Sequence, residues 1–197
     1  MKPFKKIYTA LIATTLIFSA CKEDHIDPTK PKDNNAQELI TTVVLNGYNA
    51  NNPTANPFSI KWEDLDGDGG NAPTMDTLIL DSGVSYRVQV LMLDKTKMPY
   101  DTISNEVIIE GVEHQLFYTL SNNLTSKLNF ERLDMDSNNP PLPIGLDIKI
   151  TPIHNKPFEV PLMGSVNVKL SHYDGVPKTT SPSAESDIDI HLPIKLK

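Results

Sequence analysis

Apolar and polar residues alternate along the last third of the chain. Every second residue is apolar over residues 144–150, 166–170 and 188–196, and the residues between them are polar, glycine or proline. This period of two predicts half-buried antiparallel strands with one apolar face. Pro193 falls on the polar side of the last run, which favours an edge strand or a bulge over a central strand.

The middle of the chain has shorter runs rich in apolar and β-branched residues. They predict strands over residues 39–48, 58–62, 76–81 and 84–94. Because Asp81-Ser82-Gly83 separates the last two runs, we expect these two strands to form a hairpin.

Residues 103–120 carry two conflicting signals: apolar residues at helical spacing favour a helix, and β-branched residues favour a strand. We expect a short helix or irregular turn near 104–110 and then a strand over 113–120. The 16 prolines leave little room for long helices. The pattern therefore predicts an all-β protein, a two-sheet immunoglobulin-like sandwich of about eight or nine antiparallel strands formed by residues 37–197.

The first 20 residues have the three parts of a secretory signal peptide. Lys2, Lys5 and Lys6 form a basic start, an apolar run covers residues 10–18, and two small residues follow. An uncleaved membrane anchor is the alternative, but this run is shorter than the roughly 20 residues that a spanning helix needs. We expect residues 1–20 to be removed.

Cys21 is the only cysteine of the chain and directly follows this segment. Residues 17–21, Ile-Phe-Ser-Ala-Cys, resemble the lipobox of bacterial lipoproteins, although Phe18 stands where that pattern usually has leucine. The resemblance implies that Cys21 is lipidated and becomes the first mature residue. Lipidation would also remove a lone thiol that is otherwise open to oxidation in an exported protein.

The residues after Cys21 are polar and charged. Lys22-Glu23-Asp24 resembles the surface-export signal of Bacteroidota lipoproteins, and the alternative is a solvated linker. Residues 21–36 contain two prolines and only one large apolar residue, Ile26, so we expect a lipidated flexible tether.

Charge excludes some partners. Loss of residues 1–20 reduces the 18 basic residues to 15 against 25 acidic ones, a net charge of −10. The chain has no basic patch, which argues against nucleic acid and against attraction to anionic lipid headgroups. We therefore expect the membrane to be reached through the lipid on Cys21.

An acidic loop is the best candidate for a metal site. Asp64, Asp66 and Asp68 alternate as in the first half of an EF-hand calcium loop, where carboxylates wrap a hard cation. Met75 stands where that loop has its bidentate glutamate, and Asp76 is the nearest acid. We predict a calcium site at these four aspartates, and the alternative is a solvated acidic loop.

No catalytic residue is assigned. The five histidines form no local metal motif, and no nucleophile elbow is present. His172 shares the apolar face of residues 166–170, so we expect a hydrogen-bonded, partly buried side chain rather than a ligand. Trp62 is interpreted as a core residue, with a sugar-stacking platform as the alternative.

Two triplets resemble the Asp-Ser/Thr-aliphatic sites at which Bacteroidota attach O-glycans to exported proteins. They are Asp76-Thr77-Leu78 and Asp101-Thr102-Ile103, which make Thr77 and Thr102 candidate acceptors. Triplets this short also arise by chance.

The mature chain resembles small exported lipoproteins of the Bacteroidota. The resemblance rests on the Cys21 region, Trp62 with residues 64–71, and residues 113–118 and 164–172. It implies a lipid-anchored, non-enzymatic outer-membrane protein that assists a TonB-dependent nutrient receptor. The alternatives are a calcium-stabilised adhesion or structural module and, third, a hydrolase.

Overall fold

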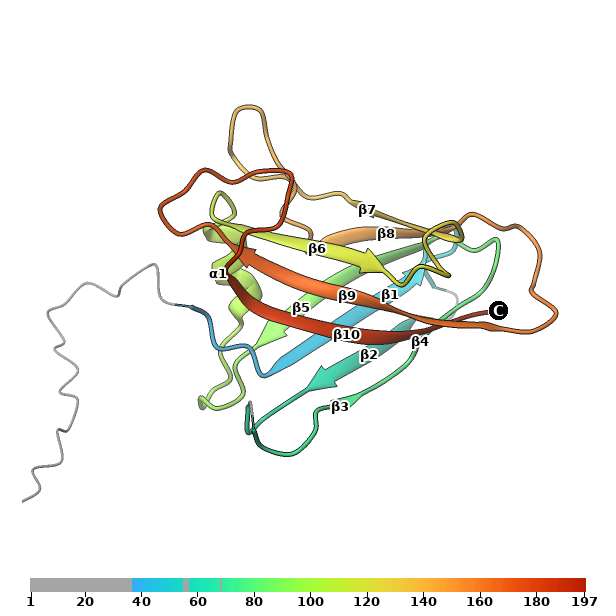
Figure 1. Ribbon diagram of the computed structural model, residues 1–197, viewed down its shortest axis with the longest axis horizontal. Coiled ribbons are helices and arrows are strands. Elements are labelled where there is room, and N and C mark those ends of the chain that lie inside the picture. The colour runs from blue at the N-terminus through green and yellow to red at the C-terminus, as the bar shows by residue number, and fades with distance from the viewer. Residues whose placement is uncertain (1–36, 55–56, 68) are drawn as a thin grey trace, which may run out of the picture. The chain divides into compact units, whose positions relative to one another are not determined.

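The computed structural model describes residues 37–54, 57–67 and 69–197. Ten strands in these ranges build two sheets that face each other, with one short helix, α1 (Ile103–Ile109), at one end (Figure 1). The predicted all-β sandwich is therefore confirmed. The expected signal peptide, Cys21 and the tether over residues 21–36 lie outside the described residues.

The larger sheet has six strands in the order β3-β2-β1-β5-β8-β7. Their bounds are β1 Thr42–Asn49, β2 Phe58–Glu63, β3 Thr74–Met75, β5 Tyr86–Leu93, β7 Leu128–Arg132 and β8 Asp147–Pro152. The smaller sheet has the order β4-β10-β9-β6. Its strands are β4 Leu78–Leu80, β6 His114–Leu120, β9 Leu162–His172 and β10 Ser186–Leu196.

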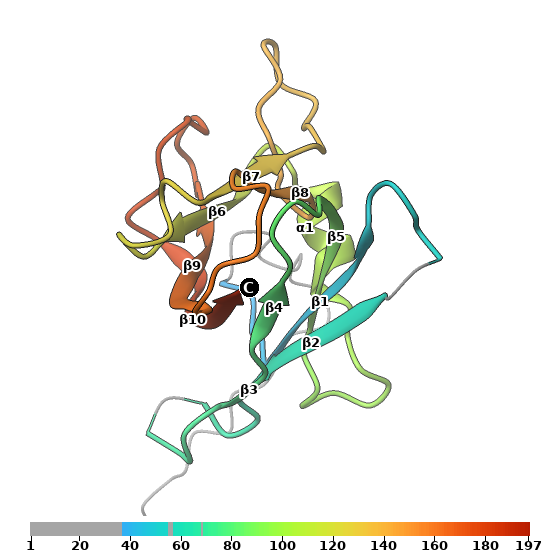
Figure 2. The same ribbon diagram turned by 90° about the vertical axis from the view of Figure 1, so that its right-hand side faces the viewer.

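The core lies between the two sheets, as Figure 2 shows end-on. In β10 the alternation seen in the sequence becomes alternation of burial, because the inward residues are buried while Asp189 and His191 face solvent. The buried residues of β10 are Ile188, Ile190, Leu192, Ile194 and Leu196. β4, β5 and β8 alternate in the same way, whereas both residues of β3 are exposed and the first four of β6 are all buried. The period-two pattern is therefore confirmed for the strands that it predicted in the last third of the chain.

β10 pairs with its two neighbouring strands over different lengths. It pairs with β9 in antiparallel register from Ser186 to Leu196, but with β4 only over Ile194–Leu196, and that pairing is parallel. Pro193 stands just before the β4 pairing begins, as its missing N–H predicts. Among the described strands, the first half of β10 therefore has β9 as its sole neighbour.

The predicted hairpin between residues 76–81 and 84–94 is wrong. β4 joins the smaller sheet and β5 joins the larger one, so the chain crosses between the sheets here. Gly83 turns the chain with φ of 77°, and Val84 N–H donates to Asp81 O. Both strands carry buried residues, and they fill the same core from opposite sides.

The mixed segment 103–120 is divided as the sequence predicts. α1 covers Ile103–Ile109, and β6 follows from His114. The helix buries Ile103 and Val107, and Met92 N–H of β5 donates to the hydroxyl of Ser104. Local apolar spacing and one hydrogen bond to β5 thus hold the helix against the larger sheet.

Two neighbouring residues of β4 test which of its side chains face the core. Leu80 is fully buried and Ile79 is 48% exposed. Leu80→Ala is expected to lower the free energy of unfolding by about 2–5 kcal/mol, because it leaves a cavity in the core. Ile79→Ala, the matched control, should change it by under about 1 kcal/mol, and urea unfolding monitored by Trp62 fluorescence measures both. Equal losses would contradict the inward orientation of Leu80 and the outward orientation of Ile79.

Candidate functional site

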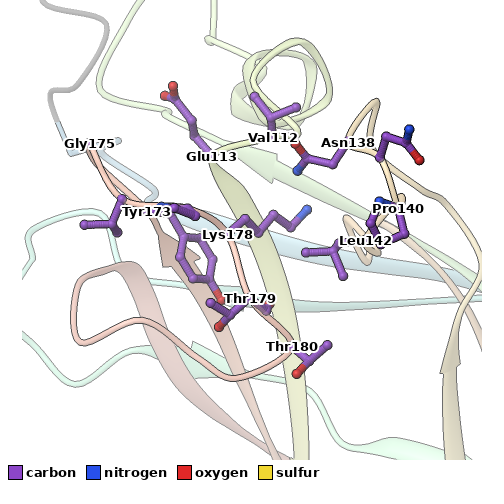
Figure 3. Close-up of a pocket in the computed structure, with 13 residues that line it drawn as sticks. Val112, Glu113, Asn138, Pro140, Leu142, Tyr173, Gly175, Lys178, Thr179 and Thr180 are labelled. Carbon is purple, nitrogen blue, oxygen red and sulfur yellow. Dashed lines mark hydrogen bonds between the residues drawn. The ribbon is translucent and has the colours of Figure 1, made fainter.

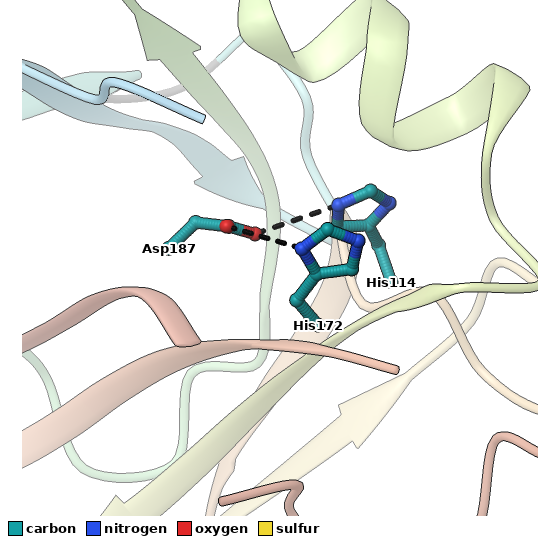
Figure 4. Close-up of side chains that lie close together, drawn as sticks. All are labelled: His114, His172 and Asp187. Carbon is teal, nitrogen blue, oxygen red and sulfur yellow. Dashed lines mark ion pairs between the residues drawn. The ribbon is translucent and has the colours of Figure 1, made fainter. Parts of the chain in front are cut away.

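Two histidines and an aspartate meet at one end of the smaller sheet (Figure 4). His114 begins β6, His172 ends β9, and the two residues are direct partners in the antiparallel register. Asp187 is the second residue of β10, the next strand over. Three segments far apart in the sequence therefore bring their side chains to one place, called the histidine cluster below.

The groups of the histidine cluster lie within a few ångströms of one another. The two imidazole rings stack with centroids 4.5 Å apart and an interplanar angle of 22°. His114 Nε2 is 3.4 Å from Asp187 Oδ2, and His172 Nδ1 is 3.5 Å from Asp187 Oδ1. One carboxylate thus faces both rings.

The cluster is buried, which makes its charges matter. His114 is 1% exposed and His172 4%, and the side chain of Asp187 is 0% exposed. Burial disfavours the charged form of His114, but Asp187 and Glu110 together outweigh burial, and the net effect raises the pKa of His114. The carboxylate therefore attracts a positive charge to this position.

Backbone groups fix the orientation of the cluster. His114 Nδ1 lies 3.2 Å from the carbonyl oxygen of Glu110, the residue that directly follows α1. Glu38 N–H donates to Asp187 Oδ1 over 3.2 Å. Gln37 Nε2 donates to the carbonyl of Ser186 over 2.7 Å. The first described residues of the chain are thereby tied to the strand that carries Asp187.

Two openings adjoin the histidine cluster. A pocket of about 320 Å³ is lined by His172 and Asp187 together with Gln37 and residues 184–186. A longer groove of about 880 Å³ runs along the first half of β10 and is called the β10 groove. Both are bounded by Gln37, Ser186 and Asp187. The cluster therefore lies just beneath an accessible surface.

The acidic loop contributes to the β10 groove. Asp64 and Asp66 line it, whereas Asp76 is not among its lining residues and Asp68 lies outside the described residues. Asp64 accepts a hydrogen bond from Gly67 N–H, and Asp66 accepts two from Asn71, which lower the pKa of Asp66. The calcium site at these residues stays a prediction.

The remaining predicted residues fall at separate places. Asp76 accepts a hydrogen bond from Lys61 N–H of β2, 2.9 Å away. Thr77 lies half-buried between β3 and β4, and Thr102 lies half-buried at the start of α1. Trp62 is 8% exposed and belongs to the core, as predicted, although one side of it lines the β10 groove.

A second polar group lies beneath another pocket, of about 680 Å³ (Figure 3). The Lys178 ammonium lies 2.9 Å from Asp136 Oδ2 and donates to Gly111 O over 2.7 Å, and both charged side chains are fully buried. Burial lowers the pKa of Lys178, and Asp136 only partly offsets this. Asp136 also accepts a hydrogen bond from Leu142 N–H within its own loop. The contacts of Lys178 therefore join three loops, those that contain Gly111, Asp136 and Lys178.

The sequence did not reveal the histidine cluster. His172 was expected to be partly buried and hydrogen-bonded, and its burial is confirmed, but its Nε2 has no hydrogen-bond partner. The sequence signal that could have indicated the cluster was a histidine at an inward position in each of two predicted strands. Only the pairing of β6 with β9 shows that these positions face each other.

Comparisons with protein-family models, with curated proteins and with solved structures returned no match. In the part of the chain that the structure describes, no helix has the length and apolar character required to cross a membrane. Function is therefore inferred from the residues themselves.

Removal of the buried lysine is expected to be strongly destabilising. Lys178→Met leaves Asp136 charged and buried, so the free energy of unfolding should fall by about 3–5 kcal/mol. Lys197→Met is the matched control, because both side chains of its pair with Asp81 are exposed and such pairs contribute about 1 kcal/mol or less. Chemical denaturation checks both variants. A small loss in Lys178→Met would show that the ion pair does not hold these loops.

Proposed function

We propose that the protein is a lipid-anchored, non-enzymatic binding or accessory protein of the cell envelope that assists an outer-membrane nutrient-uptake receptor. The observation that carries the binding role is the β10 groove, whose volume of about 880 Å³ is that of a small-molecule site. The lipobox-like residues before Cys21 support the anchor. Two or more acyl chains there would hold the protein stably at the outer membrane.

The lining of the β10 groove favours a cationic ligand. Its described lining residues include five acidic side chains and neither lysine nor arginine. The acids are Glu38, Asp64, Asp66, Asp187 and Asp189. Exposed Leu39 and Met75 and the edge of Trp62 add apolar surface. Such a mixture suits a small cation, or a nutrient that carries one, better than an anion.

The burial of the histidine cluster supports a non-enzymatic role. A hydrolase needs its base beside a nucleophile, with both within reach of the substrate. His114 is almost completely buried, and the carboxylate beside it faces two imidazoles. These groups are placed to hold something small rather than to attack a substrate in the groove.

Replacement of the proposed lipidation site tests the anchor. Cys21→Ser is expected to abolish incorporation of labelled palmitate and to move the protein from the outer-membrane fraction to the soluble fraction. Ser19→Ala keeps the cysteine and a small residue near it, so this control should remain in the membrane. Absence of label from the unaltered chain would refute the anchor, whatever the fate of the variant.

Crosslinking in intact outer membranes tests the accessory role. The unaltered protein should capture an outer-membrane receptor of the nutrient-uptake class, identified by mass spectrometry. The Cys21→Ser variant, released from the membrane, should capture much less because it loses the shared two-dimensional location. Recovery of the same proteins as with an unrelated lipoprotein would rule out a specific receptor.

A further inference from the structure

The histidine cluster has an unusual concentration of unpaired polar atoms. Five buried side-chain nitrogen or oxygen atoms of the described residues lack a hydrogen-bond partner, and four of them are at or beside this cluster. They are Glu110 Oε2, His114 Nε2, His172 Nε2 and Asp187 Oδ2. A buried polar atom left unpaired costs about 1–3 kcal/mol. Four together indicate that the cluster is built around a partner.

The hydrogen bonding of His114 shows what kind of partner is needed. The carbonyl of Glu110 can only accept, so Nδ1 carries the proton in this contact and Nε2 of the neutral ring is a lone pair. That lone pair faces the carboxylate oxygen of Asp187, another acceptor, at 3.4 Å. Two acceptors facing each other away from water require a positive charge between them.

A proton and a metal ion are the two candidates. A proton on His114 Nε2 serves only the contact with Asp187 Oδ2, whereas the same carboxylate also faces His172 Nδ1 at 3.5 Å. A metal ion instead uses one nitrogen from each ring and the carboxylate. The contact from His114 Nδ1 to a backbone carbonyl is the arrangement that orients metal-binding imidazoles in proteins.

We propose that His114, His172 and Asp187 bind one divalent transition-metal ion, with Zn²⁺ as the representative. Each residue offers one ligand atom, and these atoms lie within 4.8 Å of one another. A tetrahedral zinc ion with bonds of about 2.0–2.1 Å separates its ligands by about 3.3 Å. The distances from His114 Nε2 to Asp187 Oδ2, 3.4 Å, and from His172 Nδ1 to Asp187 Oδ1, 3.5 Å, are close to that value, although they end on different oxygens of the carboxylate.

The two imidazoles must approach and turn to share an ion. The widest separation of ligand atoms exceeds the tetrahedral value by at most about 1.5 Å, and the rings, now stacked at 22°, must rotate until the ion lies in the plane of each. Both rings come from paired strands, so the backbone beneath them is already fixed. His172 and Asp187 also line the pocket of about 320 Å³, which gives an ion a path to the cluster.

The donor set selects the class of ion. Two imidazole nitrogens with one carboxylate suit zinc and its first-row neighbours, whereas calcium and magnesium prefer six or more oxygen ligands or an octahedral oxygen shell. This site is therefore distinct in chemistry from the calcium site predicted at the acidic loop. The inference rests on the proposed binding role, because it names the class of ligand.

Metal titration of the purified full chain in detergent tests the inference. After EDTA treatment, isothermal titration should show one Zn²⁺ bound per chain, and Zn²⁺ should raise the melting temperature. Mg²⁺ should give neither effect, and Ca²⁺ should not displace the bound Zn²⁺. X-ray absorption of the loaded protein should show two imidazoles among ligands at about 2.0–2.1 Å.

Three single variants locate the site. His114→Leu, His172→Leu and Asp187→Asn should each weaken zinc binding more than about 100-fold, since even partners outside the ligand shell contribute about 10- to 100-fold. Glu110→Gln, which changes a group beside His114 Nδ1, should weaken it about tenfold. His154→Ala is the control, because His154 is exposed on the loop after β8 and should leave affinity unchanged.

These variants should remain folded without metal. In the two histidine variants, leucine replaces a buried imidazole that has an unpaired nitrogen. The Asp187→Asn variant keeps a side-chain oxygen that can accept from Glu38 N–H, so the metal-free melting temperatures should stay close to that of the unaltered chain. Loss of zinc binding with an unchanged metal-free melting temperature supports the site.

Three results would overturn it: no zinc binding at all, equal binding by all single variants, or a melting temperature that follows pH but not zinc. The last result would assign the positive charge to a proton. A negative result for zinc binding would not affect the outcome of the membrane fractionation or the receptor capture, which test the proposed function separately. Conversely, a chain that binds zinc but captures no receptor would refute the accessory role alone.

Discussion

Each sheet buries one face against the other, and the rest of the structure depends on this shared core. It requires every second residue of a long strand to be apolar, which is why the core side of β10 is a run of isoleucine and leucine. The same rule makes exceptions informative. His114 and His172 occupy inward positions where an aliphatic residue would pack more favourably. Polar residues kept at such positions point to chemistry rather than to folding.

Local patterns predict the short helix, the sandwich class and every described strand except β3 and β7, because each depends on neighbouring residues alone. Pairing between distant strands is a different matter. The turn at Gly83 looks like a hairpin locally, but β4 leaves for the other sheet because it finds its partner in β10, at the far end of the chain. The histidine cluster has the same origin. β9 and β10 follow each other along the chain, but no local signal pairs His114 of β6 with His172 of β9, so the cluster as a whole could not be predicted.

The region around Asp187 combines two kinds of donor at different depths. Carboxylates such as Asp64 and Asp189 line the open groove, where water screens them and they attract cations with little discrimination. The imidazoles beneath are shielded, so their preference for borderline transition metals is expressed more strongly. An outer acidic surface over an inner nitrogen-containing site suits capture followed by selection.

The position of β10 in the smaller sheet also sets the order of folding. β4 has β10 as its partner in that sheet, and β9 and β6 lie on the other side of β10. Since β10 follows all other described strands in the sequence, the smaller sheet cannot close, and Asp187 cannot reach the histidines, until residues 186–196 have joined it. The domain is therefore completed from its end, by long-range contacts that form slowly.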